Sequence, residues 1–235
     1  GAAFLVEARL VLDRLATARD TARAVAAGQR GRLDVGFTGS MIYRDMPRIV
    51  RAFHAQAPGM EVNLREMSSS EQIEALLHRQ IHVGFINTSA VPARLRSVPL
   101  ADDHFMCCLP DAHPLAGAAR IDLRTLADET FVMFSREVAP ANHGNVIALL
   151  HRAGIHPQTR HAARQWLTVV ALVASGMGVG LVPASMARAG ITGARFVPLQ
   201  GLEHPTVGVL AWHAELVSPA LETFIAIASP GGPPL

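Results

Sequence analysis

Between residues 33 and 86 the hydrophobic pattern changes period four times, and this alternation restricts the chain to few folds. Short apolar runs with strand character are separated by stretches in which apolar residues recur at helical spacing. Strands that alternate with helices predict a mainly parallel sheet covered by helices. The predicted elements are strand 33–37, a helix carrying Met46, Ile49, Val50 and Phe53, strand 61–64, helix 71–79 and strand 83–86.

A second group of elements follows from about Pro99. It starts with an apolar run that contains the adjacent cysteines Cys107 and Cys108, and it ends where a strand and a helix could return to the first group. The predicted elements are strands 105–109, 131–134 and 158–162, a buried strand after the glycine turn "GMGVG", short helices at 123–126 and 184–188, helices 142–153 and 166–175, then strand 207–212 and helix 220–228.

The first 28 residues differ from the rest because they contain no proline and many alanines. Apolar residues recur there at a spacing of four and three, which predicts one long helix with a broad apolar face that ends at Gly28 and Gly31. Such an apolar face must be covered, either by packing on its own domain or by pairing with the same helix of a second copy in a coiled-coil-like dimer. We favour the dimer. The stripe consists of Phe4, Ala8, Val11, Leu15, Ala18, Ala22 and Val25.

Composition excludes several classes of protein. The net charge is only +2, no lysine occurs and like charges form no block, so these residues lack the basic surface of a nucleic-acid-binding domain. No run reaches the ~18 apolar residues of a membrane span, and no signal peptide is visible. Cys107 and Cys108 would point to opposite faces of a strand, which fits two small buried thiols in a reducing compartment.

No catalytic or metal-binding constellation is found. The glycines of "SGMGVG" follow a predicted helix and precede a strand, the reverse of a dinucleotide-binding turn, so Gly176 is expected to end the helix. Eleven histidines occur without metal-ligand spacing, and no nucleophile elbow is present. We therefore expect no enzyme activity, no catalytic residue, no metal and no cofactor.

Polar side chains follow several of the predicted strands at their carboxyl ends, where open α/β sheets bind ligands. The corner "SSS" joins strand 61–64 to helix 71–79, so one serine is expected to cap the helix, with help from Glu71 or Gln72. Each of these residues taken alone has an ordinary structural explanation, as a helix cap or as a solvent-exposed side chain. Several together, beside a helix N-terminus, predict an anion-binding site. These candidates are Thr38, Gly39, Ser40, Ser68, Ser69, Ser70, Asn87, Thr88, Ser135 and Arg136.

With these residues in view, the chain resembles a LysR-type transcriptional regulator that lacks its DNA-binding domain. "AAGQRGRLDVGF" is similar to the linker helix of that family running into the first strand of the effector domain, and residues 39–85 resemble its first regulatory lobe. "CLPDAHPLAG" and "LVASGMGVGLVPASMA" resemble two signatures of the second lobe.

The resemblance implies an α/β fold like that of the type 2 periplasmic binding proteins, with two lobes joined by two crossovers and preceded by a long linker helix. The expected division is 1–30 for the linker and dimerisation helix, 31–100 plus 203–229 for lobe I, 101–202 for lobe II and 230–235 for a disordered tail. By position, Ser40, Ser69 and Asn87 match effector-contacting places, and Arg136 with the run Trp166, Leu167 and Thr168 faces them from lobe II. Many family members with carboxylated effectors carry a basic residue where this chain has Asn87.

The function implied is that of a cytoplasmic sensor that binds a small anionic, possibly aromatic, effector between its lobes. The implied partners are that effector, a second copy of the chain as dimer or tetramer, and promoter DNA through the missing N-terminal domain, with no membrane. The alternative is an exported solute-binding protein of a transporter, which shares the architecture but lacks the long helix.

Overall fold

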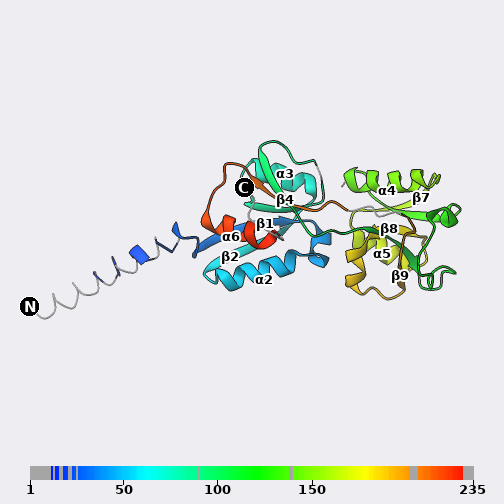
Figure 1. The fold of residues 1–235 in the computed structure, drawn as a ribbon, viewed down its shortest axis with the longest axis horizontal. Helices are drawn as coiled ribbons and strands as arrows, with labels where there is room; N and C mark the ends of the chain where they lie inside the picture. Colours follow the sequence, from blue (N-terminus) through cyan, green and yellow to red (C-terminus); the bar gives the residue numbers. More distant parts are fainter. Residues whose placement is uncertain are drawn as a thin grey trace, which may run out of the picture.

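The computed structural model describes residues 12, 14, 15, 18–20, 23, 24, 26–88, 90–137, 140–201 and 206–229, without the side chains of 158–160. The elements form two lobes lying side by side along the long axis (Figure 1). None of the helices in the described part is both long and apolar enough to cross a membrane. The predicted two-lobed α/β architecture is confirmed.

The first lobe is built on a five-stranded sheet in the order β2-β1-β3-β10-β4. β1 pairs in parallel with β2 and β3, whereas β10 pairs antiparallel with β3 and β4. The carboxyl ends of β1, β2 and β3 therefore meet at one edge of the sheet. The strands are β1 (Gly31–Phe37), β2 (Met60–Glu66), β3 (Val83–Ile86), β4 (Leu95–Pro99) and β10 (Val209–His213).

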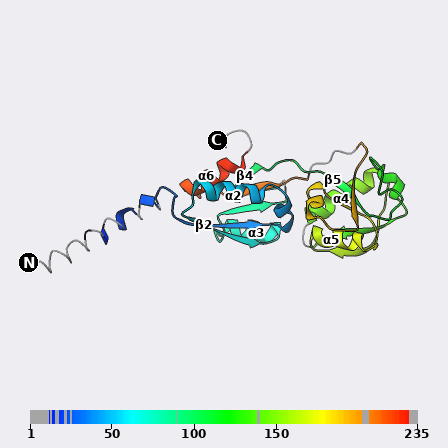
Figure 2. The same ribbon diagram turned by 90° about the horizontal axis from the view of Figure 1, so that it is seen from below.

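Helices cover both faces of this sheet (Figure 2). On one face, α2 (Met46–Gln56) packs against α6 (Pro219–Ala228), where the rings of Phe53 and Phe224 meet edge to face at 5.2 Å. On the other face lies α3 (Ser69–Leu77), whose buried Leu76 packs with residues of β3 and β10. The apolar spacing of the sequence is thus satisfied by a core on each side.

The second lobe surrounds α5 (Trp166–Ala174), whose Val169, Val170 and Val173 are fully buried. An antiparallel sheet in the order β8-β5-β9 and the parallel pair β6 and β7 pack around this helix. The remaining elements are β5 (Phe105–Pro110), β6 (Thr130–Phe134), β7 (Gln158–Ala163), β8 (Gly180–Pro183), β9 (Ala194–Pro198), α4 (Pro140–Arg152) and the 3-10 helices η1 (Gly39–Tyr43), η2 (Leu123–Leu126) and η3 (Ala184–Ala189).

The turn after α5 confirms the expected role of its glycines. Gly176 adopts a left-handed conformation (φ +77°) just beyond the helix, and Met177 N donates to Leu172 O at 3.1 Å to close the turn. A Cβ on Gly178 would lie 2.2 Å from Thr130 O, so only glycine permits this approach of the turn to β6.

Two predictions concern residues that are mostly outside the described part. In the N-terminal stretch the described residues Leu12, Leu15 and 18–20 are helical, and they lead away from the first lobe (Figure 1). Leu12 and Leu15 are 63% and 66% exposed. The other predicted stripe residues except Ala18 lie outside the described part, as does the tail 230–235.

Candidate functional site

The carboxyl edge of the first sheet gathers hydroxyl and amide groups from three strand ends. Asn87, after β3, donates from Nδ2 to Thr38 Oγ1 at 2.9 Å and to Ser40 Oγ at 3.0 Å, both after β1. Its backbone N–H donates to Ser69 Oγ at 3.2 Å, at the start of α3. Because parallel strands end together, residues up to 49 positions apart in sequence form one polar surface.

The three serines of the corner have three different surroundings. Ser68 caps α3: its Oγ accepts from Glu71 N at 3.3 Å, and Glu71 Oε2 accepts from Ser68 N at 2.7 Å. The hydrogen bond from Ser68 N lowers the pKa of Glu71. Ser69 bonds to Asn87 and lines the cavity described below, whereas Ser70 is exposed and does not line it. The predicted capping box with Glu71 is confirmed.

The second lobe supplies the facing wall from the ends of β6 and β7 and the start of α5. Trp166 is only 4% exposed, and its ring packs against Phe134 at 4.6 Å and Phe105 at 6.0 Å. Arg164 and Gln165 follow β7 directly, and Asn142 lies in the first turn of α4. Trp166 is therefore a core residue that also reaches the wall of the cavity.

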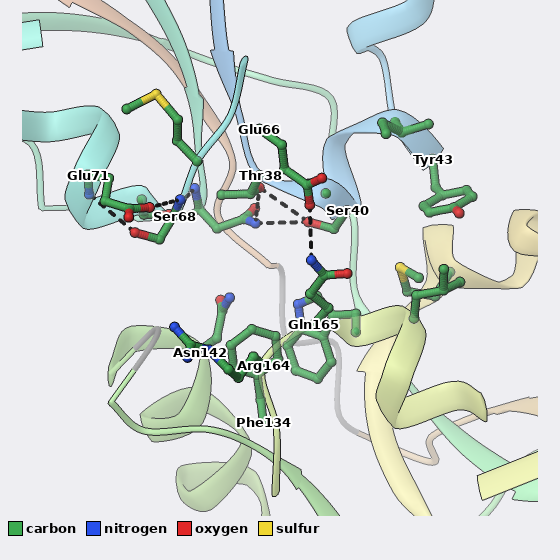
Figure 3. A pocket seen from close by; sticks show the side chains of 18 residues that line it. Thr38, Ser40, Tyr43, Glu66, Ser68, Glu71, Phe134, Asn142, Arg164 and Gln165 are labelled. Carbon is green, nitrogen blue, oxygen red and sulfur yellow. Dashed lines mark hydrogen bonds between the residues drawn. The ribbon is translucent and has the colours of Figure 1, made fainter. Parts of the chain in front are cut away.

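Between these walls lies a cavity of about 430 Å³ (Figure 3). Such a volume falls within the range that takes a small metabolite. The described residues that line it include no histidine, cysteine, aspartate or lysine, and their one cationic side chain is Arg164. Its apolar lining comes from Ile42, Tyr43, Met67, Phe134, Trp166, Leu167 and Met186.

Two hydrogen bonds connect the lobes around the cavity. Gln165 Nε2 donates to Glu66 Oε1 at 3.2 Å, joining the start of α5 to the end of β2 (Figure 3). Arg188 Nη1, in η3, donates to Tyr43 O at 3.0 Å, in η1. These two hydrogen bonds join the walls of the cavity directly.

The structure brings together eight of the thirteen residues expected at this site: Thr38, Gly39, Ser40, Ser68, Ser69, Asn87, Trp166 and Leu167. The other five, which do not line the cavity, are Ser70, Thr88, Ser135, Arg136 and Thr168. Ser135 N continues the β6–β7 pairing by donating to Ala163 O at 2.7 Å, and Arg136 is exposed in the loop that follows. Thr168 lies on an exposed position of α5.

Sequence reasoning missed several residues of the cavity, above all Glu66, Asn142, Arg164 and Gln165. Arg164 and Gln165 follow a predicted strand, so the rule that selected Ser135 and Arg136 after strand 131–134 could have selected them too. No sequence signal marks Asn142, because its place depends on how α4 lies beside β6.

A smaller cavity of about 210 Å³ lies where the chain crosses between the lobes. The buried Arg44 faces Asp103, with Nε 3.8 Å from Oδ2 and each side chain 5% exposed. Burial lowers the pKa of Arg44, and the Asp103 carboxylate opposes that shift. Asp103 Oδ1 also accepts from Ser185 N at 3.3 Å. The Asp103 carboxylate, which lies at the crossing, therefore contacts Arg44 in the first lobe and Ser185 in the second.

The adjacent cysteines are buried in β5, as expected. Burial raises the pKa of the Cys108 thiol to about 12 and raises that of Cys107 as well. Neither thiol is a reactive nucleophile near neutral pH.

Comparison of the whole chain with known proteins points to one family. The sequence matches the LysR substrate binding domain family over residues 26–230. It is 29% identical to the HTH-type transcriptional regulator YnfL of Escherichia coli over 95% of this chain and 76% of that protein. It is 31% identical to the HTH-type transcriptional regulator IlvR of Caulobacter vibrioides over 97% of this chain and 76% of that protein.

Among solved structures the fold is similar to that of CbnR, a LysR family transcriptional regulator. The TM-score is 0.86 with 28% sequence identity, over 97% of this chain and 79% of CbnR. Full-length CbnR complexed with its target DNA is similar to the same degree, with a TM-score of 0.84.

Proposed function

Because the chain belongs to the LysR substrate binding domain family, we propose that it is the effector-sensing part of a cytoplasmic transcriptional regulator. It binds a small anionic metabolite between its lobes and controls the action of the whole protein at a promoter. Family membership favours this function over that of a transporter's solute-binding protein, which the architecture alone left open.

The observation that carries the choice of an anion is the convergence of donors in the cavity. Ser69 Oγ already accepts a hydrogen bond from Asn87 N, so its own O–H is available to the cavity. Arg164 lines the opposite wall and supplies a positive charge. A carboxylate between them would form hydrogen bonds with both lobes and hold them together.

The cavity is suited to binding and not to chemistry. Its described lining includes no histidine, cysteine or aspartate, and the hydroxyl groups of Thr38 and Ser40 both accept from the amide of Asn87, which is not a base. We therefore infer that the ligand is bound and released without chemical modification. Mass spectrometry of the recovered ligand would test this.

The test of binding is a thermal-shift screen of carboxylic acids, with and without aromatic rings, on wild type and variants. A ligand at ~100 times its dissociation constant adds about 2.7 kcal/mol of stability. Ser40→Ala and Ser69→Ala should each weaken that ligand about 10- to 100-fold, since hydrogen bonds to charged groups are worth ~1.5–3 kcal/mol. The exposed Ser97 of β4 supplies the control Ser97→Ala. If both pocket variants bind the ligand as wild type does, the effector site is elsewhere.

The proposed partners besides the effector are a second copy of the chain, as dimer or tetramer, and promoter DNA through a separate N-terminal domain. CbnR, which this chain resembles, has been seen with its target DNA at full length. With a net charge of +2, these 235 residues by themselves should not select a promoter sequence. Sequence-selective retardation of promoter DNA by this chain alone would contradict that assignment.

A further inference from the structure

The cavity between the lobes is electrically polarised along its length. At one end, Arg164 and Asn142 of the second lobe face Ser68 and Glu71 of the first (Figure 3). At the other end, the carboxylate of Glu66 lies beside Ser40 and Gln165 (Figure 3). A ligand that spans the cavity therefore meets Arg164, together with the cap residue Glu71, at one end and the carboxylate of Glu66 at the other.

The carboxylate of Glu66 is held in place and keeps room for a further hydrogen bond. Its Oε1 accepts one hydrogen bond, from Gln165 Nε2 at 3.2 Å. The same oxygen lies against Gly39, where a Cβ would approach to 2.8 Å, so a larger residue there would displace it. Because an ionised carboxylate has about four acceptor sites, the bond to Gln165 leaves Glu66 able to accept from a ligand.

The other two charged groups of the lining, Glu71 and Arg164, lie together at the opposite end of the cavity. Glu71 is committed to the cap of α3, and the charge of Arg164 acts on it favourably. Glu66 then remains as a negative charge without a cationic partner in the described lining. A second anionic group placed at that end would be repelled, and a hydroxyl or ammonium group would be attracted.

We propose that the effector is a carboxylic acid with a hydrogen-bond donor, a hydroxyl or an ammonium group, at the end remote from its carboxylate, and that Glu66 selects this donor. This inference rests on the proposed function, because it assumes that the carboxylate lies between Ser69 and Arg164. The side chains of Ile42, Trp166 and Leu167 also line the cavity and fit an apolar body such as a ring or a short chain.

The test uses two matched series of compounds on the whole chain. The first contains benzoate, its para-hydroxy and para-aminomethyl derivatives, and terephthalate. The second contains pentanoate, its terminal hydroxy and amino derivatives, and glutarate. Calorimetry should give the donor-bearing acids dissociation constants about 10-fold or more below that of the unsubstituted acid in at least one series. The dicarboxylate should bind weakest in that series.

Substitution of Glu66 separates charge from hydrogen bonding. Glu66→Gln should weaken the amino compound about 10-fold and strengthen the dicarboxylate, because the negative charge is gone while an acceptor for the hydroxyl remains. Arg164→Gln should weaken every carboxylate in the series by a similar factor. Glu61→Gln, a change at an exposed position of the same strand outside the cavity, is the control and should alter none of them.

The possible failures can be told apart. If carboxylates bind and lose affinity with Ser69→Ala, but donor-bearing acids bind no better than the unsubstituted or dicarboxylic acids, the inference is wrong and the proposed function stands. The same conclusion follows if Glu66→Gln changes all four compounds of a series equally. If no acid of either series binds wild type, the proposed anion site fails and the inference falls with it.

Discussion

At the scale of single residues, Ser68 and Ser69 are neighbours in sequence with separate roles. Ser68 Oγ accepts from Glu71 N to cap α3, while Ser69 Oγ accepts from Asn87 N and lines the cavity. Ser68→Ala should therefore cost about 1 kcal/mol of unfolding free energy and, although Ser68 also lines the cavity, should weaken the ligand less than Ser69→Ala does. Ser69→Ala should mainly weaken the ligand and cost less unfolding free energy. Urea denaturation and calorimetry on both variants check this, and equal effects of both on affinity would contradict it.

Asp34 makes part of the stability depend on pH. Its side chain is 7% exposed and accepts from Asn63 Nδ2 at 2.9 Å and Arg32 Nε at 3.0 Å. Burial alone raises the pKa of Asp34, but the hydrogen bonds from Asn63 and Arg32 outweigh it and hold the pKa below 3.8. A lowered folded-state pKa contributes stability that is present above the unfolded pKa and is lost as pH falls through the folded pKa.

The matching experiment compares Asp34→Asn with wild type. At neutral pH the variant should be less stable by about 1–3 kcal/mol, since the buried charged acceptor for Asn63 Nδ2 and Arg32 Nε is removed. The difference should shrink below about pH 4 as the wild-type carboxyl gains its proton. A difference in unfolding free energy that stays constant from neutral pH to strong acid would show that the charge of Asp34 contributes nothing.

At the scale of elements, periodicity predicted the buried helices and strands and missed the marginal ones. β4 (Leu95–Pro99) and β9 (Ala194–Pro198) are edge strands, so only one or two residues of each need to be buried and no clear alternation is imposed. η1 was missed because its five residues give no helical period. At the site the difficulty was another one: Arg164 and Gln165 follow the predicted strand 158–162, and nothing in their sequence sets them apart from Ser135 and Arg136 after strand 131–134.

The described part of the N-terminal stretch presents two exposed leucines, Leu12 and Leu15, in helical conformation. Exposed leucines at helical spacing favour association with a second copy, because each buried leucine stabilises by about 1.5–3 kcal/mol. Replacing both with Asp should raise the dissociation constant of the dimer about 100-fold or more in sedimentation. Val217→Asp, at a residue that is 74% exposed outside that stretch, is the control. A wild-type chain that is monomeric at high micromolar concentration would rule out the dimer helix.

At the scale of the whole molecule, the placement of the lobes could not be read from periodicity. A helical or strand period reports which face of an element is buried, and it says nothing of which sheet the element joins. β10 follows all the strands of the second lobe in sequence, yet it lies between β3 and β4 in the first sheet. The cavity depends on this return, because its walls come from two lobes that the crossing segments connect.

The ion pair at the crossing should therefore govern the stability of both lobes as one unit. Arg44 lies just after η1, and Asp103 lies between β4 and β5, where its backbone O accepts from Thr206 N at 2.7 Å on the returning segment. Asp103 Oδ2 has no hydrogen bond from the described residues and faces Arg44 Nε at 3.8 Å, so the contact is ionic. Removing one member leaves the other charge buried without compensation, which costs about 3–5 kcal/mol in comparable pairs.

A double-mutant cycle measures this coupling. Arg44→Met and Asp103→Asn should each lower the unfolding free energy strongly, and the double variant should lose less than the sum of the two by about 1–3 kcal/mol. The asparagine keeps an oxygen for Ser185 N, so the cycle isolates the charge. The control is Arg48→Met: its pair with Asp45 at 3.6 Å involves an Arg48 side chain that is 57% exposed, so the loss should stay below about 1 kcal/mol. Additive losses at Arg44 and Asp103 would show that the two charges act independently and that the crossing is held by packing alone.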